Sequence, residues 1–166
     1  MTPPDGPISE TENRKWIEQL PKAELHLHLE GAIPLEALWS LIQKHGGDPS
    51  ISTKQDLRQR LTYSDFPEFI ETWIWKNSFL QNYDDFTFIA EEVALDLHRQ
   101  NILYAELFFS PSRFSHRGMT TAGLSEAIRR GLAKVPQCET WLIADVVRDH
   151  GPESAAKTLM EASDAR

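Results

Sequence analysis

Polar and apolar side chains alternate along residues 23–29, and this alternation predicts a β-strand. The strand lies within the segment KAELHLHLEGA, residues 22–32. Because successive side chains of a strand point to opposite faces, the leucines share one face and the polar side chains share the other. The polar face is expected to hold Glu24, His26, His28 and Glu30. The segment therefore predicts a strand with one apolar face and one face of potential ligands.

Helical periodicity replaces this alternation after Gly31. Residues 34–47 place Pro34 at a suitable first helical position, space their apolar residues three or four apart and reach a stop at Gly46. The further segments with helical periodicity are residues 52–61, 64–80 and 83–101. The first strand is thus expected to be followed by several helices before the chain returns to the sheet.

Two later apolar segments, residues 101–111 and 139–149, predict further strands. A helix is expected between them, and another after the second. These helices cover residues 121–135 and 151–166. Strands that are apolar on both faces and separated by helices are typical of a parallel sheet built from βα units. The sequence therefore predicts an α/β fold with three strands, too few for a closed barrel, which needs eight strands and typically about 250 residues.

The start of the chain is polar. Residues 1–14 are expected to form a flexible tail, and residues 14–22 a short helix that Pro21 ends. This start has no apolar core of the kind that secretory signals carry. Cys138 is the single cysteine and cannot form a disulfide within the chain, which is typical of a reducing compartment. We therefore expect a cytoplasmic protein.

Charge and hydropathy exclude two classes of partner. The 166 residues carry a formal net charge of −8 without clustered Lys and Arg, whereas binding to nucleic acid requires a basic surface. No apolar stretch approaches the roughly 18 residues of a membrane span. The sequence therefore indicates neither a nucleic-acid nor a membrane partner, and favours a soluble small-molecule ligand.

The two histidines of the first strand are spaced as a pair of metal ligands. Imidazoles at positions i and i+2 of a strand project in parallel, which suits two neighbouring ligands of one zinc-like ion. The alternative is a hydrogen-bonded pair in a polar pocket. Four polar side chains on one buried strand face would leave several groups unsatisfied without an ion or a substrate. The pattern therefore favours His26 and His28 as metal ligands, whereas His45, His98 and His116 have no partner at such spacing.

The stretch LPKAELHLHLEGAIP, residues 20–34, resembles the first-strand signature of the adenosine deaminase family. Residues 101–114, NILYAELFFSPSRF, and residues 141–155, WLIADVVRDHGPESA, are similar to the second and third strands of that family. Members are metal-dependent amidohydrolases that deaminate 6-aminopurines within a (β/α)₈ barrel. The resemblance implies a partial TIM barrel, comprising the first three βα units with a helical insertion after the first strand, over residues 15–166.

The same resemblance implies a set of site residues. His26 and His28 would bind one zinc ion, and Glu30 would lie beside the substrate, where the following Gly31 lets the backbone approach a ligand. Adenosine-specific members more often carry aspartate at the position of Glu30, so the choice among 6-aminopurines stays open. The remaining substrate-binding candidates are Phe66, Phe69, Ile70, Trp73 and Ser110. The spacing of the four residues between Phe66 and Trp73 is explained equally well by a helix that faces a core. The Ser-Pro pair at the strand end could simply form a turn.

The family's other metal ligands and its proton-transferring residues lie on later strands, so the resemblance places them beyond Arg166. The first hypothesis is thus the N-terminal part of a zinc-dependent aminopurine deaminase that is inactive alone. It is either a truncated chain or one chain of a split or cleaved enzyme, which a complementary C-terminal polypeptide would complete. A non-catalytic half-barrel that binds a ligand or partner is the second hypothesis, and another amidohydrolase-type hydrolase is the third. A cytidine-type deaminase is excluded because its zinc site needs a C-x-x-C pair.

Overall fold

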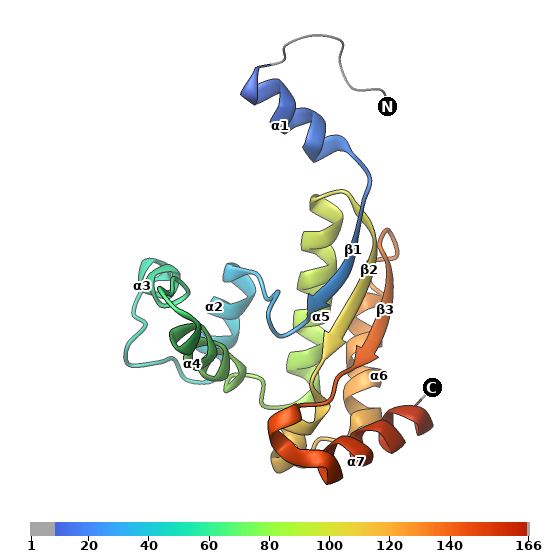
Figure 1. Cartoon of the computed structure of the whole chain (residues 1–166). Helices are drawn as coiled ribbons and strands as arrows, with labels where there is room; N and C mark the ends of the chain where they lie inside the picture. The colour runs from blue at the N-terminus through green and yellow to red at the C-terminus, as the bar shows by residue number, and fades with distance from the viewer. Residues whose placement is uncertain (1–8, 166) are drawn as a thin grey trace.

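A three-stranded parallel sheet forms the centre of the molecule (Figure 1). The computed structural model describes residues 9–165. The strands, in spatial order, are β1 (Lys22–His28), β2 (Ile102–Phe109) and β3 (Glu139–Ala144). Both pairings are parallel. The predicted strands and their parallel arrangement are therefore confirmed, although β3 ends before the polar residues that follow Ala144.

Two helices cover one face of this sheet. The helices α5 (Tyr83–Arg99) and α6 (Thr121–Leu132) lie side by side behind the strands (Figure 1). In β2, Ala105, Leu107 and Phe109 are buried, whereas the alternate residues Tyr104, Glu106 and Phe108 are only partly buried. This alternation shows that one face of the central strand lies in the core, while the described residues leave the opposite face partly open.

A helical insertion separates β1 from α5, as the sequence predicts. It contains α2 (Leu35–Lys44), α3 (Lys54–Arg60) and α4 (Phe66–Asn77), and lies to one side of the sheet (Figure 1). Side-chain caps define where its later helices begin. Thr53 accepts a hydrogen bond from the backbone of Asp56, and Asp65 accepts one from the backbone of Glu68, each satisfying a free N–H of a first turn.

Helix α1 (Glu10–Gln19) begins four residues earlier than the sequence pattern predicts. Its N-terminus is fixed by a capping box in which Ser9 and Glu12 exchange side-chain and backbone hydrogen bonds. Most of the predicted tail, residues 1–8, lies outside the described residues. Two 3-10 helices, η1 (Pro111–Arg117) and η2 (Arg148–His150), follow β2 and β3 and were not predicted. The last helix is α7 (Gly151–Asp164).

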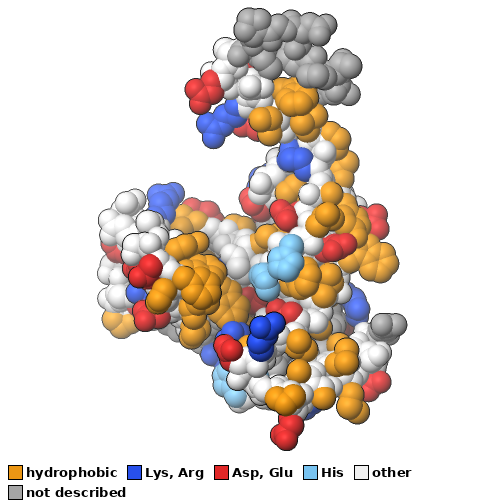
Figure 2. All heavy atoms as spheres, viewed as in Figure 1, with side chains coloured by type: hydrophobic (Ala, Val, Ile, Leu, Met, Phe, Trp, Pro, Cys, Tyr) orange, Lys and Arg blue, Asp and Glu red, His pale blue; other side chains and the backbone are white. Residues whose placement is uncertain are grey.

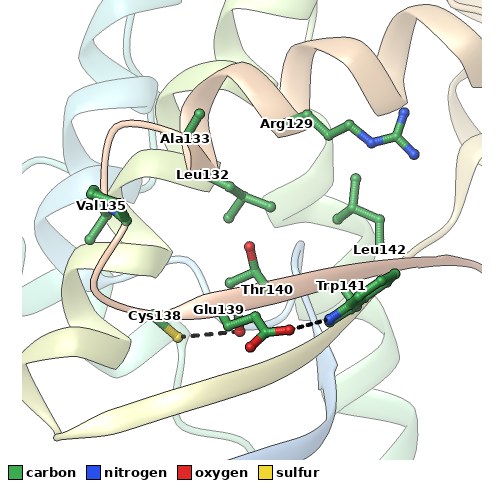
Figure 3. A pocket seen from close by; sticks show the side chains of 10 residues that line it. Arg129, Leu132, Ala133, Val135, Cys138, Glu139, Thr140, Trp141 and Leu142 are labelled. Atoms are coloured by element: carbon green, nitrogen blue, oxygen red, sulfur yellow. Dashed lines mark hydrogen bonds between the residues drawn. The ribbon is translucent and has the colours of Figure 1, made fainter.

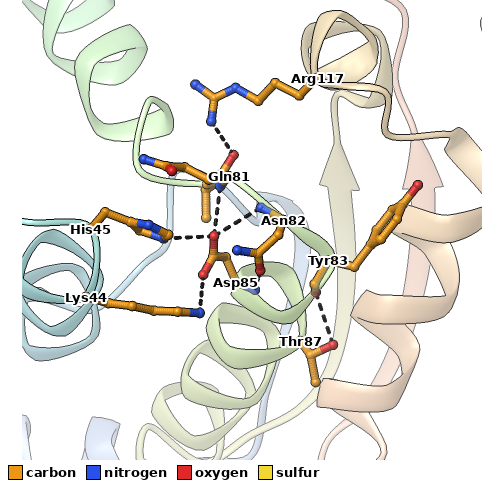
Figure 4. A network of polar contacts seen from close by, with 9 residues as sticks. Lys44, His45, Gln81, Asn82, Tyr83, Asp85, Thr87 and Arg117 are labelled. Carbon is orange, nitrogen blue, oxygen red and sulfur yellow. Dashed lines mark hydrogen bonds and ion pairs between the residues drawn. The ribbon is translucent and has the colours of Figure 1, made fainter.

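A buried carboxylate joins α2 to α5 (Figure 4). Asp85, in the first turn of α5, is fully buried and accepts hydrogen bonds from the backbone of Gln81 and Asn82. Its other partners are Lys44 Nζ at 2.6 Å and His45 Nε2 at 3.0 Å. The contact between His45 and Asp85 joins residues that are 40 positions apart along the chain, so the spacing of residues within one element does not predict it.

Both outer edges of the sheet are unpaired among residues 9–165. The exposed side chains include Leu25 on β1, 61% exposed, and Trp141 on β3, 59% exposed. A hollow of about 470 Å³ beside β3 is lined by Trp141, Leu142 and the end of α6 with Leu132 (Figure 3). Within the described part of the chain, no helix combines the length and apolar character that crossing a bilayer requires.

Candidate active site

His26 and His28 lie next to each other at the C-terminal end of β1. Their ring centroids are 5.2 Å apart, and both rings pack against Phe108 of β2, at 4.2 and 5.7 Å respectively. Figure 2 shows histidine side chains at the surface over the strands. The structure therefore places the two imidazoles together on the open side of the sheet, as the sequence pattern predicts.

The strict alternation expected along β1 is interrupted. Glu24 pairs with Ala105 and Leu27 pairs with Leu107, so three steps on β1 match two on β2. This extra residue is a β-bulge, which re-aims side chains near a strand end. Glu30, expected on the same strand face as the histidines, lies instead in the turn that follows β1.

Glu30 is fully buried behind the end of β2. Its Oε1 accepts a hydrogen bond of 2.9 Å from the backbone N–H of Ser110, while its Oε2 is buried and has no hydrogen-bond partner among the described residues. Burial raises the pKa of Glu30 to about 7, because the ionised form loses its hydration. This carboxyl group is therefore not a solvated strand-end charge, and it can hold a proton near neutral pH.

Lys76 is a second buried ionisable residue, which the sequence analysis did not find. It lies on α4, is 7% exposed, and its Nζ donates to the carbonyl oxygen of Gly31 at 2.9 Å. Burial lowers its pKa to about 8, partly opposed by the charge of Glu30. The signal in the sequence was a lysine within the mostly apolar segment WIWKNSF. Lys76 thus ties α4 to the turn that carries Glu30 and Gly31.

Asp145 completes the polar group and was also missed. It directly follows β3, and its Oδ2 accepts a hydrogen bond of 2.9 Å from Ser110 Oγ. The same oxygen lies 3.6 Å from His28 Nδ1, and its Oδ1 is buried without a partner in the described structure. The sequence does contain an indication of this role, because Asp145 is the first polar residue after a strand of the parallel sheet. Active sites of barrels lie at this end of the strands.

An apolar cavity of about 460 Å³ adjoins these residues. The strand ends contribute His28, Gly31, Ser110 and Asp145 to its lining, and α4 contributes Phe69, Ile70 and Trp73. Phe66 does not line this cavity. It is 70% exposed and its ring lies 5.9 Å from that of Phe69. The structure thus brings six of the predicted site residues to one cavity, with His26 and Glu30 adjacent. The six are His28, Gly31, Phe69, Ile70, Trp73 and Ser110.

The donor set fits a metal ion only in part. The neighbouring imidazoles of His26 and His28 are suitable ligands for zinc. Across residues 9–165, no group of three or more His, Cys, Asp or Glu side chains is placed to hold an ion. Since a catalytic zinc normally has three protein ligands and an open position, these residues supply two positions of such a site and do not complete it.

Comparison with known proteins agrees with this geometry. The chain is 32% identical to an adenine deaminase of Crocosphaera subtropica over 150 residues, covering 88% of this chain and 46% of the relative. An adenine deaminase of Pseudomonas savastanoi pv. phaseolicola is 30% identical over 151 residues, covering 89% and 47%. The chain therefore spans about half the length of the relatives it matches.

Solved structures show the same fold. A zinc-bound amidohydrolase from Burkhoderia ambifaria superposes with a TM-score of 0.82 at 24% identity, covering 98% of this chain and 45% of that chain. An N6-mAMP deaminase from Arabidopsis superposes with a TM-score of 0.71 at 26% identity, covering 90% and 48%. These neighbours support the assignment of the three βα units to a partial TIM barrel.

The sequence model of the family described as "Adenosine deaminase" matches residues 21–164. This match includes all three strands and every residue of the candidate site. The chain therefore belongs to the adenosine deaminase family and corresponds to the N-terminal half of its members.

Proposed function

We propose that the protein to which this chain belongs removes the amino group of a 6-aminopurine by hydrolysis and releases ammonia in the cytoplasm. The observation that carries the proposal is the placement of two strand imidazoles beside an apolar cavity at the same strand ends. Relatives named adenine deaminase and a structural neighbour named N6-mAMP deaminase support the class of reaction. The substrate is a small aminopurine, either the free base or a nucleoside or nucleotide that carries it.

We assign His26 and His28 as two ligands of one zinc ion in the complete protein. Support comes from their strand spacing and from the amidohydrolase neighbour crystallised with zinc. When bound, such an ion makes water a stronger acid near neutral pH, which provides a nucleophile for the ring carbon that bears the amino group. Asp145, with Oδ2 3.6 Å from His28 Nδ1, would fix the orientation of this imidazole, as carboxylates do for ligating histidines.

The cavity walls would bind the purine. Phe69 and Trp73 line the cavity, and their aromatic side chains would pack against a flat heterocycle. Phe66 would extend this wall at its outer rim through its contact with Phe69. Gly31 at the cavity edge permits close approach of the ligand to the backbone, since it carries no side chain.

Polar groups at the strand ends would orient the purine. Ser110 lines the cavity, and its hydroxyl donates a hydrogen bond to Asp145. We also assign a substrate contact to Glu30, because its Oε2 has no hydrogen-bond partner in the described structure. A partly protonated carboxyl group there could donate a hydrogen bond to a ring nitrogen as well as accept one.

The reaction also requires further metal ligands and groups that exchange protons with the substrate. The chain spans about half the length of its relatives, and its two imidazoles leave the metal site incomplete. We therefore propose that a complementary C-terminal segment, on the same polypeptide or on a partner, supplies these groups.

A second candidate is a non-catalytic half-barrel that binds a purine or a partner. The observation that favours it is the apolar cavity of about 460 Å³, which residues of this chain form by themselves. The two candidates differ in their need for metal, because a binding module would retain a purine without zinc.

The test is ammonia release by the complete, zinc-loaded protein from adenine, adenosine and adenosine 5′-monophosphate. We expect turnover of at least one of the three, and loss of turnover after chelation with recovery on adding zinc. Purine binding without ammonia release from any of them would instead establish the binding module. Neither binding nor turnover would contradict both candidates.

A further inference from the structure

A second hollow, of about 280 Å³, lies between α4 and η1. From α4 it is lined by Trp73 and Asn77, and from η1 by Arg113, His116 and Arg117. Trp73 and Arg113 also line the proposed purine cavity. The two cavities are therefore neighbours that share one wall, and the proposed function leaves the second one without a role.

The lining of this hollow is basic in an acidic protein. The chain contains 25 acidic and 17 basic residues, for a net charge of −8, yet none of the described residues that line the hollow is acidic. Two guanidinium groups, those of Arg113 and Arg117, and the imidazole of His116 lie there together. His116 Nε2 accepts a hydrogen bond of 3.2 Å from Arg117 Nε, so the fixed charges of the hollow are the two guanidinium groups. Two neighbouring positive charges repel each other unless an anion offsets them.

The structure holds both guanidinium groups in place without using a carboxylate. Arg113 stacks over the ring of Trp73, with Cζ 4.4 Å from the ring centroid, and its Nε is buried without a partner in the described structure. Arg117 Nη1 donates to the carbonyl oxygens of Ser78 and Leu80, at 3.1 and 2.7 Å. Figure 4 shows this side chain extending toward the segment that precedes α5. Stacking and carbonyl bonds fix a guanidinium group while leaving its charge uncompensated.

Asn77 adds unused hydrogen-bonding capacity to the same wall. The residue is 7% exposed, and neither its Nδ2 nor its Oδ1 has a hydrogen-bond partner among residues 9–165. Leaving both atoms of a buried amide unpaired costs stability. A ligand with oxygen acceptors in the hollow would recover part of this cost after a rotation of the amide.

We propose that this hollow binds a phosphoryl oxyanion. Guanidinium groups match the spacing of phosphate oxygens and bind them through charge-assisted hydrogen bonds, and Arg113, Arg117 and Asn77 supply such donors from two sides. The anion is either free phosphate or the phosphate of a nucleotide whose base occupies the neighbouring cavity. Only the nucleotide source rests on the proposed function.

The primary test is calorimetric titration of the protein with inorganic phosphate. We expect saturable binding that Arg113→Gln weakens by about tenfold, the loss of one charge-assisted pair. His116→Glu places a negative charge at an exposed rim position, leaves the core untouched and should weaken binding by a similar factor. Arg58→Gln, which removes the same charge from an exposed position on α3, serves as the matched control and should bind as the wild type does.

Titration with adenosine and adenosine 5′-monophosphate then distinguishes the two sources. If the monophosphate binds at least tenfold more tightly than adenosine, and Arg113→Gln removes the difference, the phosphate belongs to the nucleotide. Equal binding of the two, with phosphate binding intact, assigns the hollow to the free ion. The proposal is overturned if wild-type protein shows no saturable phosphate binding, or if Arg113→Gln and His116→Glu, shown to be folded by circular dichroism, bind phosphate as tightly as Arg58→Gln does.

Discussion

The burial of Lys76 makes the free energy of unfolding depend on pH. Its pKa falls from 10.5 to about 8 in the folded protein, so between these pH values the unfolded chain holds the proton more tightly. Stability then rises with pH across this window. We expect the free energy of unfolding of the wild type, relative to Lys76→Met, to increase by at most about 3 kcal/mol between pH 8 and 10.5.

Urea unfolding at several pH values measures this difference. Lys157→Met is the control, because the Lys157 side chain is 71% exposed and its loss should give a difference that changes little with pH. A constant difference between the wild type and Lys76→Met over the window would show that Lys76 titrates as an ordinary surface lysine.

Single residues of the site differ in how far the sequence predicts them. The adjacency of His26 and His28 is predictable because their spacing within one strand is local information. Lys76 and Asp145 were not found, because their significance depends on α4 and the end of β3 reaching the β1 turn and the end of β2. Glu30 is a candidate from the sequence, but its complete burial and its hydrogen bond to the backbone of Ser110, 80 residues away, are not local information.

At the scale of elements, Asp85 links α5 to α2, and His45 is one of its partners. Removing a donor from a buried carboxylate costs about 1–3 kcal/mol, so His45→Ala should lower the free energy of unfolding by that amount. His98→Ala on the exposed end of the same α5 helix is the control and should change stability by less than about 0.5 kcal/mol. Equal stability of the two variants in thermal or urea unfolding would disprove the link.

The close packing of α6 on α5 depends on Gly131. A Cβ atom at this position would lie 2.8 Å from the Cβ of Ala90 and would also overlap the backbone of Thr87. Overpacking costs about 1–3 kcal/mol, and the cost is high here because backbone atoms of Thr87 cannot move aside easily. It therefore exceeds the gain of about 1 kcal/mol in helix propensity that alanine brings. Gly131→Ala should therefore lower the melting temperature, whereas the exposed Arg130→Ala should not; a Gly131→Ala protein as stable as the wild type would contradict this packing.

The helices and strands themselves were largely predictable. Long segments with helical periodicity predict helices well. The pattern over residues 83–101, for example, agrees with the observed bounds of α5 to within two residues. The two 3-10 helices were missed, because η2 has only three residues and η1 begins at the Ser-Pro pair, which by itself indicates a turn. The early start of α1 was missed because its capping box, Ser9 with Glu12, precedes the first apolar residue of the helix.

At the scale of the whole molecule, the isolated chain exposes surfaces that a complete barrel would cover. Both sheet edges are unpaired among the described residues, and Trp141 lies exposed on β3. Unprotected strand edges pair with other chains. We expect light scattering to show oligomers of the isolated chain, and Trp141→Lys to shift the distribution towards monomer. A compact wild-type monomer at all concentrations would contradict this expectation.

The central proposal is that β1 supplies two ligands of a catalytic zinc ion in a deaminase whose N-terminal half is this chain. The most direct test is the zinc content of the complete protein by atomic absorption, with ammonia release measured on the same samples. We predict that His26→Ala and His28→Ala each lose most of the bound zinc and most of the activity, because removing one of few ligands leaves the ion underligated, whereas the exposed His98→Ala retains both. Zinc content unchanged in both strand variants would contradict the account.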